Sequence, residues 1–441
     1  MNPFLKSLGF EPGKHSVRTE MLAGLTTFLT MSYILAVNPD ILGQTGMDKG
    51  AVFTTTVIAS VVATLVMAFY AKSPFVLAPG MGLNAFFAFT LVIGLGYSWQ
   101  EALAAVFIEG VVFILLTIFK VREAIVRSIP VNIRYAITAG IGLFIALIGL
   151  KGGGIIVSNE ATLVALGEWT PQSVLAILGV LIGGVLMAKK VKGGLFFTIL
   201  LITLAGIPFG VTNIPEGFSP VSLPASIEPI ALKFDFSRFL NFDLNYLVVV
   251  FSLMFMDLFD TLGTLLGAST KAGMVDEKGE VKNLNKALMA DAVGTAVGAA
   301  LGTSTVTTYV ESTSGVAEGG RTGLTAFSAA MLFLCALVFS PIFMIIPSAA
   351  TCSALVIVGV MMVEQTSRID FSDFTETVPC FIAMVMMPFA YSISEGIVLG
   401  MLSYVVIKVL AGRFREVSLM MYILAAFFVF KYIAPFILSA D

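Results

Sequence analysis

The chain has 441 residues, of which 58% are hydrophobic and only 12% are charged, against about 25% charged residues in soluble domains. A soluble chain of this length would divide into domains with polar surfaces, and this composition leaves too few polar residues to cover them, so we predict an all-α polytopic membrane protein. The net charge of −3 offers no basic footprint for nucleic acid, which excludes a nucleic-acid partner.

Cysteine and histidine usage narrows the function further. Cys335, Cys352 and Cys380 are odd in number and lie in apolar runs, and the only histidine, His15, lies in the polar N-terminal segment. We therefore expect no disulfide framework, no metal site, no cofactor and no Ser-His-Asp triad. The first apolar run, 21–37, lacks a cleavage site and is expected to be retained as a membrane span.

Apolar runs of about 20 residues, the length that a helix needs to cross a bilayer, follow one another along most of the chain. We predict about fourteen membrane-spanning segments. They lie near 20–38, 52–71, 75–96, 101–119, 134–150, 172–188, 194–212, 243–267, 285–301, 304–317, 323–345, 349–364, 376–393 and 395–411. A further apolar run, 418–437, could cross the membrane, lie in the interface or pack on the bundle.

The basic residues test this division, because Lys and Arg collect on cytoplasmic connections. With the N-terminus in the cytoplasm, twenty of the 25 basic residues fall on the cytoplasmic side. Only four fall on external connections: Lys49, Lys151, Lys233 and Arg238. The distribution supports fourteen spans and predicts a multi-pass protein of the cell membrane, embedded in its lipid bilayer, with a cytoplasmic N-terminus.

Weak internal similarity suggests two halves of seven spans each. Ile129-Pro130 precedes the fifth span, and Ile346-Pro347 precedes the twelfth, 217 residues later. A repeat of seven spans inverts its own orientation. Inverted repeats are typical of secondary transporters, whose substrate binds between interrupted helices near the middle of the membrane.

Two spans contain residues that interrupt a helix. The third includes 78–84, with Pro79, Gly80 and Gly82, and the tenth includes 302–315, which is rich in Thr and Ser. We predict that the tenth forms a short strand leading into a half-helix. Backbone freed from a helix must line protein or a cavity. Asn84 and Glu311 are 227 residues apart, close to the repeat offset, so we expect the two interrupted segments to meet at the pseudo-two-fold axis. The alternatives are a simple kink in the third span and an external polar loop in the tenth.

Acidic residues inside spans are costly and mark functional sites by default. Asp257 and Asp260 lie three residues apart on one face of the eighth span, and it is costly for both to be ionised there. One of them is expected to hold a proton near neutral pH, which a proton-coupled carrier needs. We expect Asp260 and Glu311 to be functional, and Glu109 and Asp291 to serve as hydrogen-bond partners between helices.

These residue types suit one class of substrate. Carboxylates accept hydrogen bonds from N–H groups, freed backbone N–H groups donate to carbonyls, and aromatic rings stack on flat molecules. An anion would require Arg or Lys, and the eighth and tenth spans contain neither. The site therefore favours a flat, neutral heterocycle over sulfate, phosphate or a carboxylate.

At these positions the chain resembles the AzgA-like purine permeases of the nucleobase:cation symporter-2 family. The resemblance covers nearly the whole chain and is specific in four blocks. They are 19–31 with Asn38-Pro39, 78–87, 259–264 and 302–323.

The resemblance implies that Asp260 and Glu311 bind the purine and couple protons. Asp257 is added to the proton-coupling residues because it lies on the same helix face as Asp260. It implies further substrate-site residues in the first, third, eighth and tenth spans. They are Thr27 and Thr30, which could close the pocket, Gly82, Asn84 and Gly263, which shape it, and Tyr309 and Val310, which present backbone.

The resemblance also implies a 7+7 inverted repeat with a core domain (spans 1–4 and 8–11), a gate domain (spans 5–7 and 12–14) and a homodimer. In residues, the predicted division is an N-terminal segment 1–19, core 20–119 and 243–345, gate 134–212 and 349–411, an external loop 213–242 and a C-terminal segment 412–441.

The predicted function is import of a purine nucleobase, guanine or hypoxanthine foremost, by proton symport with alternating access. Within the same class, an adenine permease, a uracil, xanthine or urate carrier, or a sodium-driven carrier stays open. An intramembrane aspartyl hydrolase is disfavoured because no second Gly-x-Gly-Asp block exists to face Asp260. A channel would be distinguished by its turnover. We do not expect the protein to be an enzyme.

Overall fold

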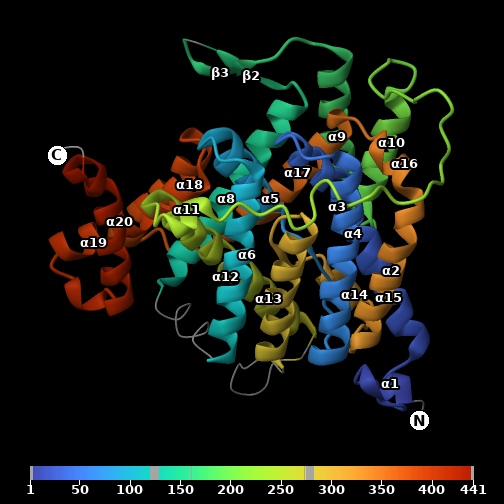
Figure 1. The fold of residues 1–441 in the computed structure, drawn as a ribbon, viewed down its shortest axis with the longest axis horizontal. Coiled ribbons are helices and arrows are strands. Elements are labelled where there is room, and N and C mark those ends of the chain that lie inside the picture. Colours follow the sequence, from blue (N-terminus) through green and yellow to red (C-terminus); the bar gives the residue numbers. More distant parts are fainter. Residues whose placement is uncertain (1–2, 120–128, 160, 273, 275–282, 439–441) are drawn as a thin grey trace.

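The computed structural model describes residues 3–119, 129–159, 161–272, 274 and 283–438. Its helices pack into one bundle, with α1 (Pro3–Ser7) at one end and the hairpin of β2 (Ile156–Asn159) and β3 (Leu163–Leu166) at the other (Figure 1). Eight described helices are long and apolar enough to cross a membrane, and the remaining predicted spans correspond to other helices and to short strand–helix segments.

The elements follow the fourteen predicted spans in order. The first seven spans are α2 (Val17–Met31) with α3 (Ile34–Gly43), α4 (Lys49–Val66) with η1 (Met67–Ala71), β1 (Leu77–Pro79) with α5 (Met81–Ala85) and η2 (Phe86–Gly94), α6 (Trp99–Ile118), α8 (Val131–Gly152), α9 (Pro171–Ala188) and α10 (Gly194–Gly206). The second seven are α12 (Leu244–Ala272), α13 (Leu284–Leu301), β4 (Val306–Thr308) with α14 (Ser312–Ala317), α15 (Gly323–Ala336) with η3 (Leu337–Phe339) and α16 (Ser340–Met344), α17 (Ser348–Val363), α18 (Phe374–Phe389) and α19 (Ile393–Leu410).

The first span differs from the prediction. It was expected as one helix near 20–38, but α2 ends at Met31 and α3 begins at Ile34, with Tyr33 in the N-cap position of α3. Pro39 lies inside α3, which continues to Gly43. Within the described residues, the first span is therefore interrupted, as the third and tenth are.

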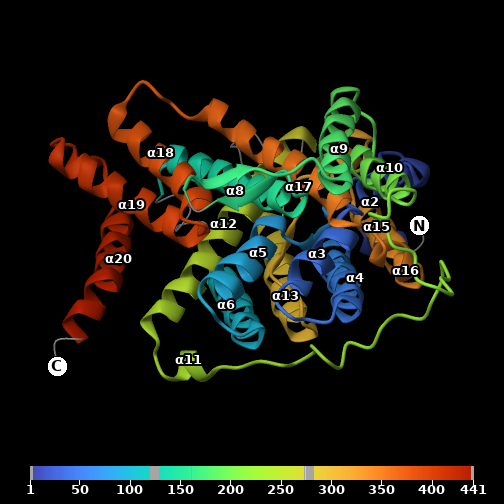
Figure 2. The same ribbon diagram turned by 90° about the horizontal axis from the view of Figure 1, so that it is seen from above.

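The remaining described elements lie outside these spans. They are α11 (Ser237–Leu240) in the connection before α12, η4 (Glu364–Arg368), η5 (Phe414–Glu416) and α20 (Leu419–Leu438). The last of these is the apolar run 418–437, and it extends at the edge of the bundle beside α19 (Figure 2). The segment between α10 and α11 crosses the bundle without long helices (Figure 1).

The 7+7 inverted repeat is visible in equivalent caps and in one close contact. Pro130 and Pro347, the prolines that suggested the repeat, are the N-caps of α8 and α17. These two helices pack together, and a Cβ on Gly359 would lie 2.6 Å from the carbonyl oxygen of Gly142. The same 217-residue offset relates these two glycines. The halves thus meet backbone to backbone, as small residues allow in membranes.

Two groups of helices pack mainly within themselves. In one, α2 contacts α15, and α13 contacts both α4 and α6. In the other, α8 contacts α17 and α18, α9 contacts α10 and α17, and α18 contacts α19. Between them stand α5 and α12, each of which also contacts α8. Figure 2 shows α5 and α12 lying between the α6–α13 side and α8.

Candidate functional site

The interrupted third and tenth spans meet as a two-stranded antiparallel sheet. β1 pairs with β4, with Ala78 opposite Thr307, which confirms the strand predicted in the tenth span. The Gly80 N–H donates to the Thr305 carbonyl at 2.9 Å, and the Tyr309 N–H donates to the Val76 carbonyl at 3.1 Å. Backbone groups that leave a helix are thereby satisfied inside the protein, as the membrane interior requires.

Glycines allow these two segments to approach each other and α8. A Cβ on Gly80 would lie 2.5 Å from Cγ2 of Thr307, so only glycine fits against β4 at this point. A Cβ on Gly82 would lie 2.7 Å from Cγ2 of Ile141 in α8. Gly82 therefore sets how closely α5 and α8 pack, and its part in shaping a substrate site stays a prediction.

Asp260 and Glu311 have few hydrogen-bond donors among the described residues. Asp260 lies in α12, partly accessible, and its carboxylate accepts no hydrogen bond from the described residues. The carboxylates that act on it electrostatically are Asp291 and Glu311. Glu311 is the N-cap residue of α14 and is only 7% exposed. Its Oε1 accepts a hydrogen bond of 2.8 Å from the hydroxyl of Tyr33.

Asp257 belongs to a different cluster, which joins α12, α13 and β4. The Thr261 hydroxyl lies 2.9 Å from Oδ1 of Asp257, 2.9 Å from Oδ1 of Asp291 and 2.6 Å from the hydroxyl of Thr307. The Thr308 N–H also donates to Asp291, at 3.2 Å. These contacts confirm that Asp291 is a hydrogen-bond partner between elements.

Glu109 has the same kind of role. Its Oε2 accepts a hydrogen bond of 2.7 Å from Thr305, which joins α6 to the residue just before β4. Glu109 thus joins two elements by a hydrogen bond, as predicted, although its partner precedes a strand and does not lie in a helix. Within the described residues, no three His, Cys, Asp or Glu side chains come together in a way that could hold a metal ion.

Asn84 and Tyr309 hold the interrupted spans together. The Asn84 amide donates to the Pro79 carbonyl at 3.4 Å, and its oxygen accepts from Ser304. The Tyr309 hydroxyl also donates to the Pro79 carbonyl. These bonds join the third and tenth spans, as the predicted meeting of the two interrupted segments requires. Contact of Asn84 or Tyr309 with a substrate stays a prediction.

The other predicted residues lie around this centre. Thr27 and Thr30 donate to carbonyls of their own helix, Thr27 to Ala23 at 3.0 Å and Thr30 to Thr27 at 2.9 Å. Thr27 is buried against α14, since a Cβ on Gly315 would lie 2.1 Å from its hydroxyl oxygen. Their hydroxyls are thus engaged within α2, and closure of a pocket by them stays a prediction.

Two residues of the predicted site need separate mention. The side chain of Val310 is 46% exposed and follows the buried Tyr309. Gly263 lies in α12, but its surroundings fall outside the described residues. The predicted contributions of both to substrate binding stay predictions.

Tyr33 is the site residue that the sequence did not reveal. It is 1% exposed, and its ring centroid lies 6.5 Å from that of Tyr309. Neither Gly nor Pro marks the break between α2 and α3. The signal that was present is a hydroxylated aromatic residue within an otherwise apolar run.

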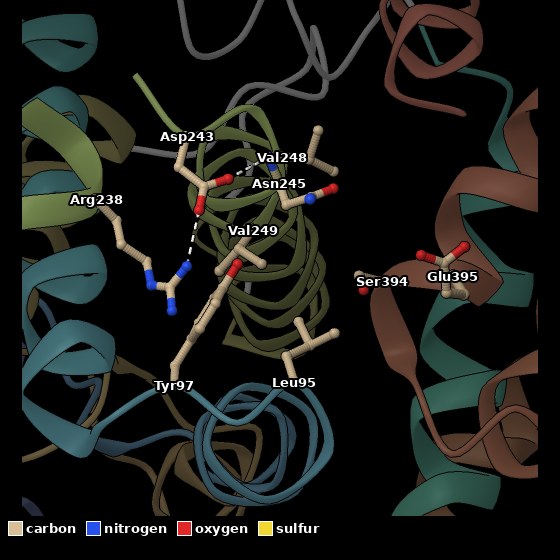
Figure 3. Close-up of a pocket in the computed structure, with 9 residues that line it drawn as sticks. All are labelled: Leu95, Tyr97, Arg238, Asp243, Asn245, Val248, Val249, Ser394 and Glu395. Carbon is tan, nitrogen blue, oxygen red and sulfur yellow. Dashed lines mark hydrogen bonds and ion pairs between the residues drawn. The ribbon is translucent and has the colours of Figure 1, made fainter. Parts of the chain in front are cut away.

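A separate cavity of about 350 Å³ lies between two groups of helices. Figure 3 shows Tyr97, Arg238 and Asp243 on one side, with Ser394 and Glu395 of α19 across the gap. Arg238 bonds Asp243 at 2.9 Å and Glu101 at 2.7 Å. Burial raises the pKa of Tyr97 to about 12, so its phenol stays protonated beneath the guanidinium of Arg238, 4.6 Å from the ring centroid.

Comparison with solved structures shows the fold. The transmembrane domain of the cyanobacterial bicarbonate transporter BicA matches with a TM-score of 0.67 at 17% identity, covering 88% of this chain and 98% of that chain. The murine solute carrier 26 family member A9 anion transporter, in an inward-facing state, matches with a TM-score of 0.64 at 12% identity, covering 94% and 71%. Both have the same 7+7 inverted-repeat fold.

Comparison with known sequences shows the family. A putative permease of Methanocaldococcus jannaschii is 48% identical over 97% of this chain and 98% of its own length. An adenine permease of Escherichia coli K12 is 46% identical, covering 95% and 93%, and a guanine/hypoxanthine permease of Bacillus subtilis is 41% identical, covering 94% and 96%. The permease family model (Xan_ur_permease) matches residues 18–399. The chain therefore belongs to this permease family, the nucleobase:cation symporter-2 group that its motifs resemble.

Proposed function

We propose that this multi-pass membrane protein imports a purine nucleobase by proton symport with alternating access. One observation carries the proposal: beside two interrupted spans, Asp260 accepts no hydrogen bond from the described residues, and Tyr33 is the one described side chain that donates to Glu311. Unpaired acids inside a membrane are costly and are retained for function. Purine N–H groups are the donors that these positions fit.

The same two acids support proton coupling. Asp260 and Glu311 interact electrostatically, and two neighbouring carboxylates repel each other strongly when both are ionised in a medium of low dielectric. A proton on one of them removes this repulsion, and a bound purine N–H stabilises the other. Proton and substrate are therefore expected to bind together. Asp257 is proposed to assist, because Thr261 links it to Asp291.

Alternating access requires two bodies that move against each other. We assign the core to 20–119 and 243–345 and the gate to 134–212 and 349–411, which correspond to the two groups of helices that pack within themselves. With the N-terminus in the cytoplasm, the cavity of Figure 3 lies on the external side, between core residues such as Tyr97 and the gate residue Ser394. We take it as the outer mouth of the route. The functional unit is proposed to be a homodimer in the cell membrane.

Guanine or hypoxanthine is the proposed substrate, and adenine is the second candidate. The adenine permease relative has the higher identity to this chain, 46% against 41% for the guanine/hypoxanthine permease. The carboxylates of the site can accept hydrogen bonds from the N–H groups of any purine. Uracil, xanthine or urate would also offer N–H groups, so these belong in the same competition test.

The test is uptake of radiolabelled hypoxanthine into proteoliposomes, with an inward proton gradient and with unlabelled adenine, guanine, uracil, xanthine and urate as competitors. We expect saturable uptake that collapses with a protonophore and is blocked most strongly by guanine or hypoxanthine. Uptake that requires sodium and ignores the protonophore would contradict proton symport. Competition by uracil alone would contradict the purine assignment.

A further inference from the structure

Tyr33 joins the first interrupted span to the candidate site. Its carbonyl accepts the N–H groups of Ala36 and Val37, so Tyr33 opens α3 as α2 ends. This break fixes the position of its side chain, which is buried beside Tyr309. The residue is thus held by backbone structure on one side and by an aromatic neighbour on the other.

The phenol of Tyr33 reaches one specific oxygen. Its hydroxyl donates to Oε1 of Glu311 at 2.8 Å, across 278 residues of sequence. Within the described residues, no other side chain donates to the Glu311 carboxylate. The two oxygens of Glu311 therefore differ: Oε1 accepts from Tyr33, whereas Oε2 has no side-chain donor among the described residues; the backbone N–H of Glu311 is a further donor to the carboxylate. Hydrogen bonds to ionised groups are stronger than neutral ones and fix geometry more firmly.

This asymmetry bears on how many donors Glu311 can bind. A carboxylate grips two adjacent N–H donors when both of its oxygens face the ligand. Guanine offers such a pair on one edge, the ring N1–H and a 2-amino N–H, whereas hypoxanthine offers only the ring N1–H on that edge. A Glu311 side chain that presents only Oε2 matches a single N–H.

We propose that Tyr33 is a positioning residue that determines specificity, because its hydrogen bond to Oε1 restricts Glu311 to one N–H donor of the purine. The inference rests on the proposed function and deepens it. With Tyr33 in place, Glu311 is oriented for a single N–H, and the 2-amino group of guanine gains nothing from it. Without the phenol hydroxyl, both oxygens can turn toward the ligand.

The test is Tyr33→Phe, with dissociation constants for hypoxanthine and guanine measured by calorimetry on purified protein. We expect hypoxanthine to bind about tenfold more weakly, because the orienting bond to a charged group is lost. Guanine should lose less than about threefold, because the freed oxygen can accept its second donor. The ratio of the hypoxanthine to the guanine dissociation constant should therefore rise several-fold.

Tyr246→Phe is the matched control. Tyr246 is also a buried tyrosine, and its hydroxyl donates at the same 2.8 Å length to the Glu101 carbonyl, away from the site. This variant should leave the ratio unchanged. Equal losses of both purines in Tyr33→Phe, or no loss, would overturn the role of Tyr33 in specificity and leave the proposed function standing. If the wild-type protein binds neither purine, the proposed function fails first and the inference fails with it.

Discussion

Two of the regions in which the described residues bury charge are built in opposite ways. At the end of α19, Lys408 has no exposed side-chain surface, and its ammonium group lies 2.8 Å from Glu376, 2.7 Å from Glu416 and 3.8 Å from Asp373. Arg413 pairs with two of the same carboxylates, Asp373 and Glu416. Around Asp260 and Glu311, the only described side-chain partner is the neutral phenol of Tyr33.

The difference separates charges that hold the fold from charges that we propose to serve transport. A buried cation surrounded by carboxylates is satisfied, and removing one member leaves the others uncompensated. Acids that keep acceptor positions stabilise nothing by themselves, so their presence requires another reason. The Lys408 cluster joins α18, α19 and η5 into one unit, whereas within the described residues Tyr33 is the one side chain that donates to either Asp260 or Glu311.

The largest expected effect comes from removing charge at the site. We expect Asp260→Asn and Glu311→Gln each to weaken purine binding about 100-fold, since a hydrogen bond to a charged acceptor contributes about 1.5–3 kcal/mol. Binding is measured by calorimetry, and melting temperature reports folding. Glu109→Gln is the control, because this buried acid accepts a hydrogen bond from Thr305. Wild-type affinity in both site variants would remove the distinction between the two regions.

Removing the cation of the second region should act on stability. Lys408→Met leaves Glu376, Glu416 and Asp373 close together without their central partner, and we expect the free energy of unfolding to fall by about 2 kcal/mol, with purine affinity unchanged. Lys189→Met is the control, because Lys189 is exposed at the end of α9. Chemical unfolding in detergent measures both. Unchanged stability would show that the cluster is an exposed, weak ion-pair network instead.

A smaller effect is expected where no charge is involved. In Gly359→Ala, the new Cβ would lie 2.6 Å from the Gly142 carbonyl oxygen, and forcing α8 and α17 apart should cost about 1.5 kcal/mol of unfolding free energy. Gly184→Ala in α9 meets nothing within 4 Å and should be neutral or slightly stabilising. Equal melting temperatures for the two variants would contradict the close contact between the halves.

The smallest effect is the acid sensitivity of the Lys408 cluster. Hydrogen bonds from Thr375, and then from Arg413, lower the pKa of Asp373 from 3.8 to about 2. Hydrogen bonds from Arg413, and then from Lys408, lower the pKa of Glu416 from 4.5 to about 2. Lowered carboxyl pKa values stabilise the fold above the unfolded values, and this contribution disappears as the pH falls toward 2.

Melting temperature should therefore be insensitive to these two groups between pH 7 and pH 5 and should decline below about pH 4. In Glu416→Gln the decline should be shallower, because one of the two titrating groups is gone. A decline of the same steepness in this variant would show that other carboxylates cause the acid sensitivity.

Sequence patterns predicted the parts of this fold that depend on local chemistry. Pro79 and Gly80 predicted an interrupted helix, and the Thr-rich run predicted the strand β4, because these residue types disfavour a helix wherever they occur. The membrane cost of a charge singled out Asp260 and Glu311. The positions of Pro130 and Pro347 reported the repeat because proline suits a helix start.

The missed features depend on partners that lie far away in the sequence. The break at Tyr33 has no Gly or Pro beside it, and its hydroxyl partner Glu311 is 278 residues away. The pairing of β1 with β4 could not be read from the third span alone, where only an interruption was visible. The bond from Ser304 to the amide oxygen of Asn84 was not foreseen either, because only three-dimensional packing brings these residues together; contact of Asn84 with a substrate stays a prediction.

The pairing of β1 with β4 also sets an order of events during synthesis. When the third span leaves the ribosome, its extended backbone has no partner, because the Tyr309 side of the sheet is 230 residues further along the chain. At roughly 5–20 residues per second, this delay is about 10–45 seconds. Lipid cannot satisfy the open backbone in that time. The first half of the chain must therefore be sheltered, by the insertion machinery or by water, until its partner strand arrives.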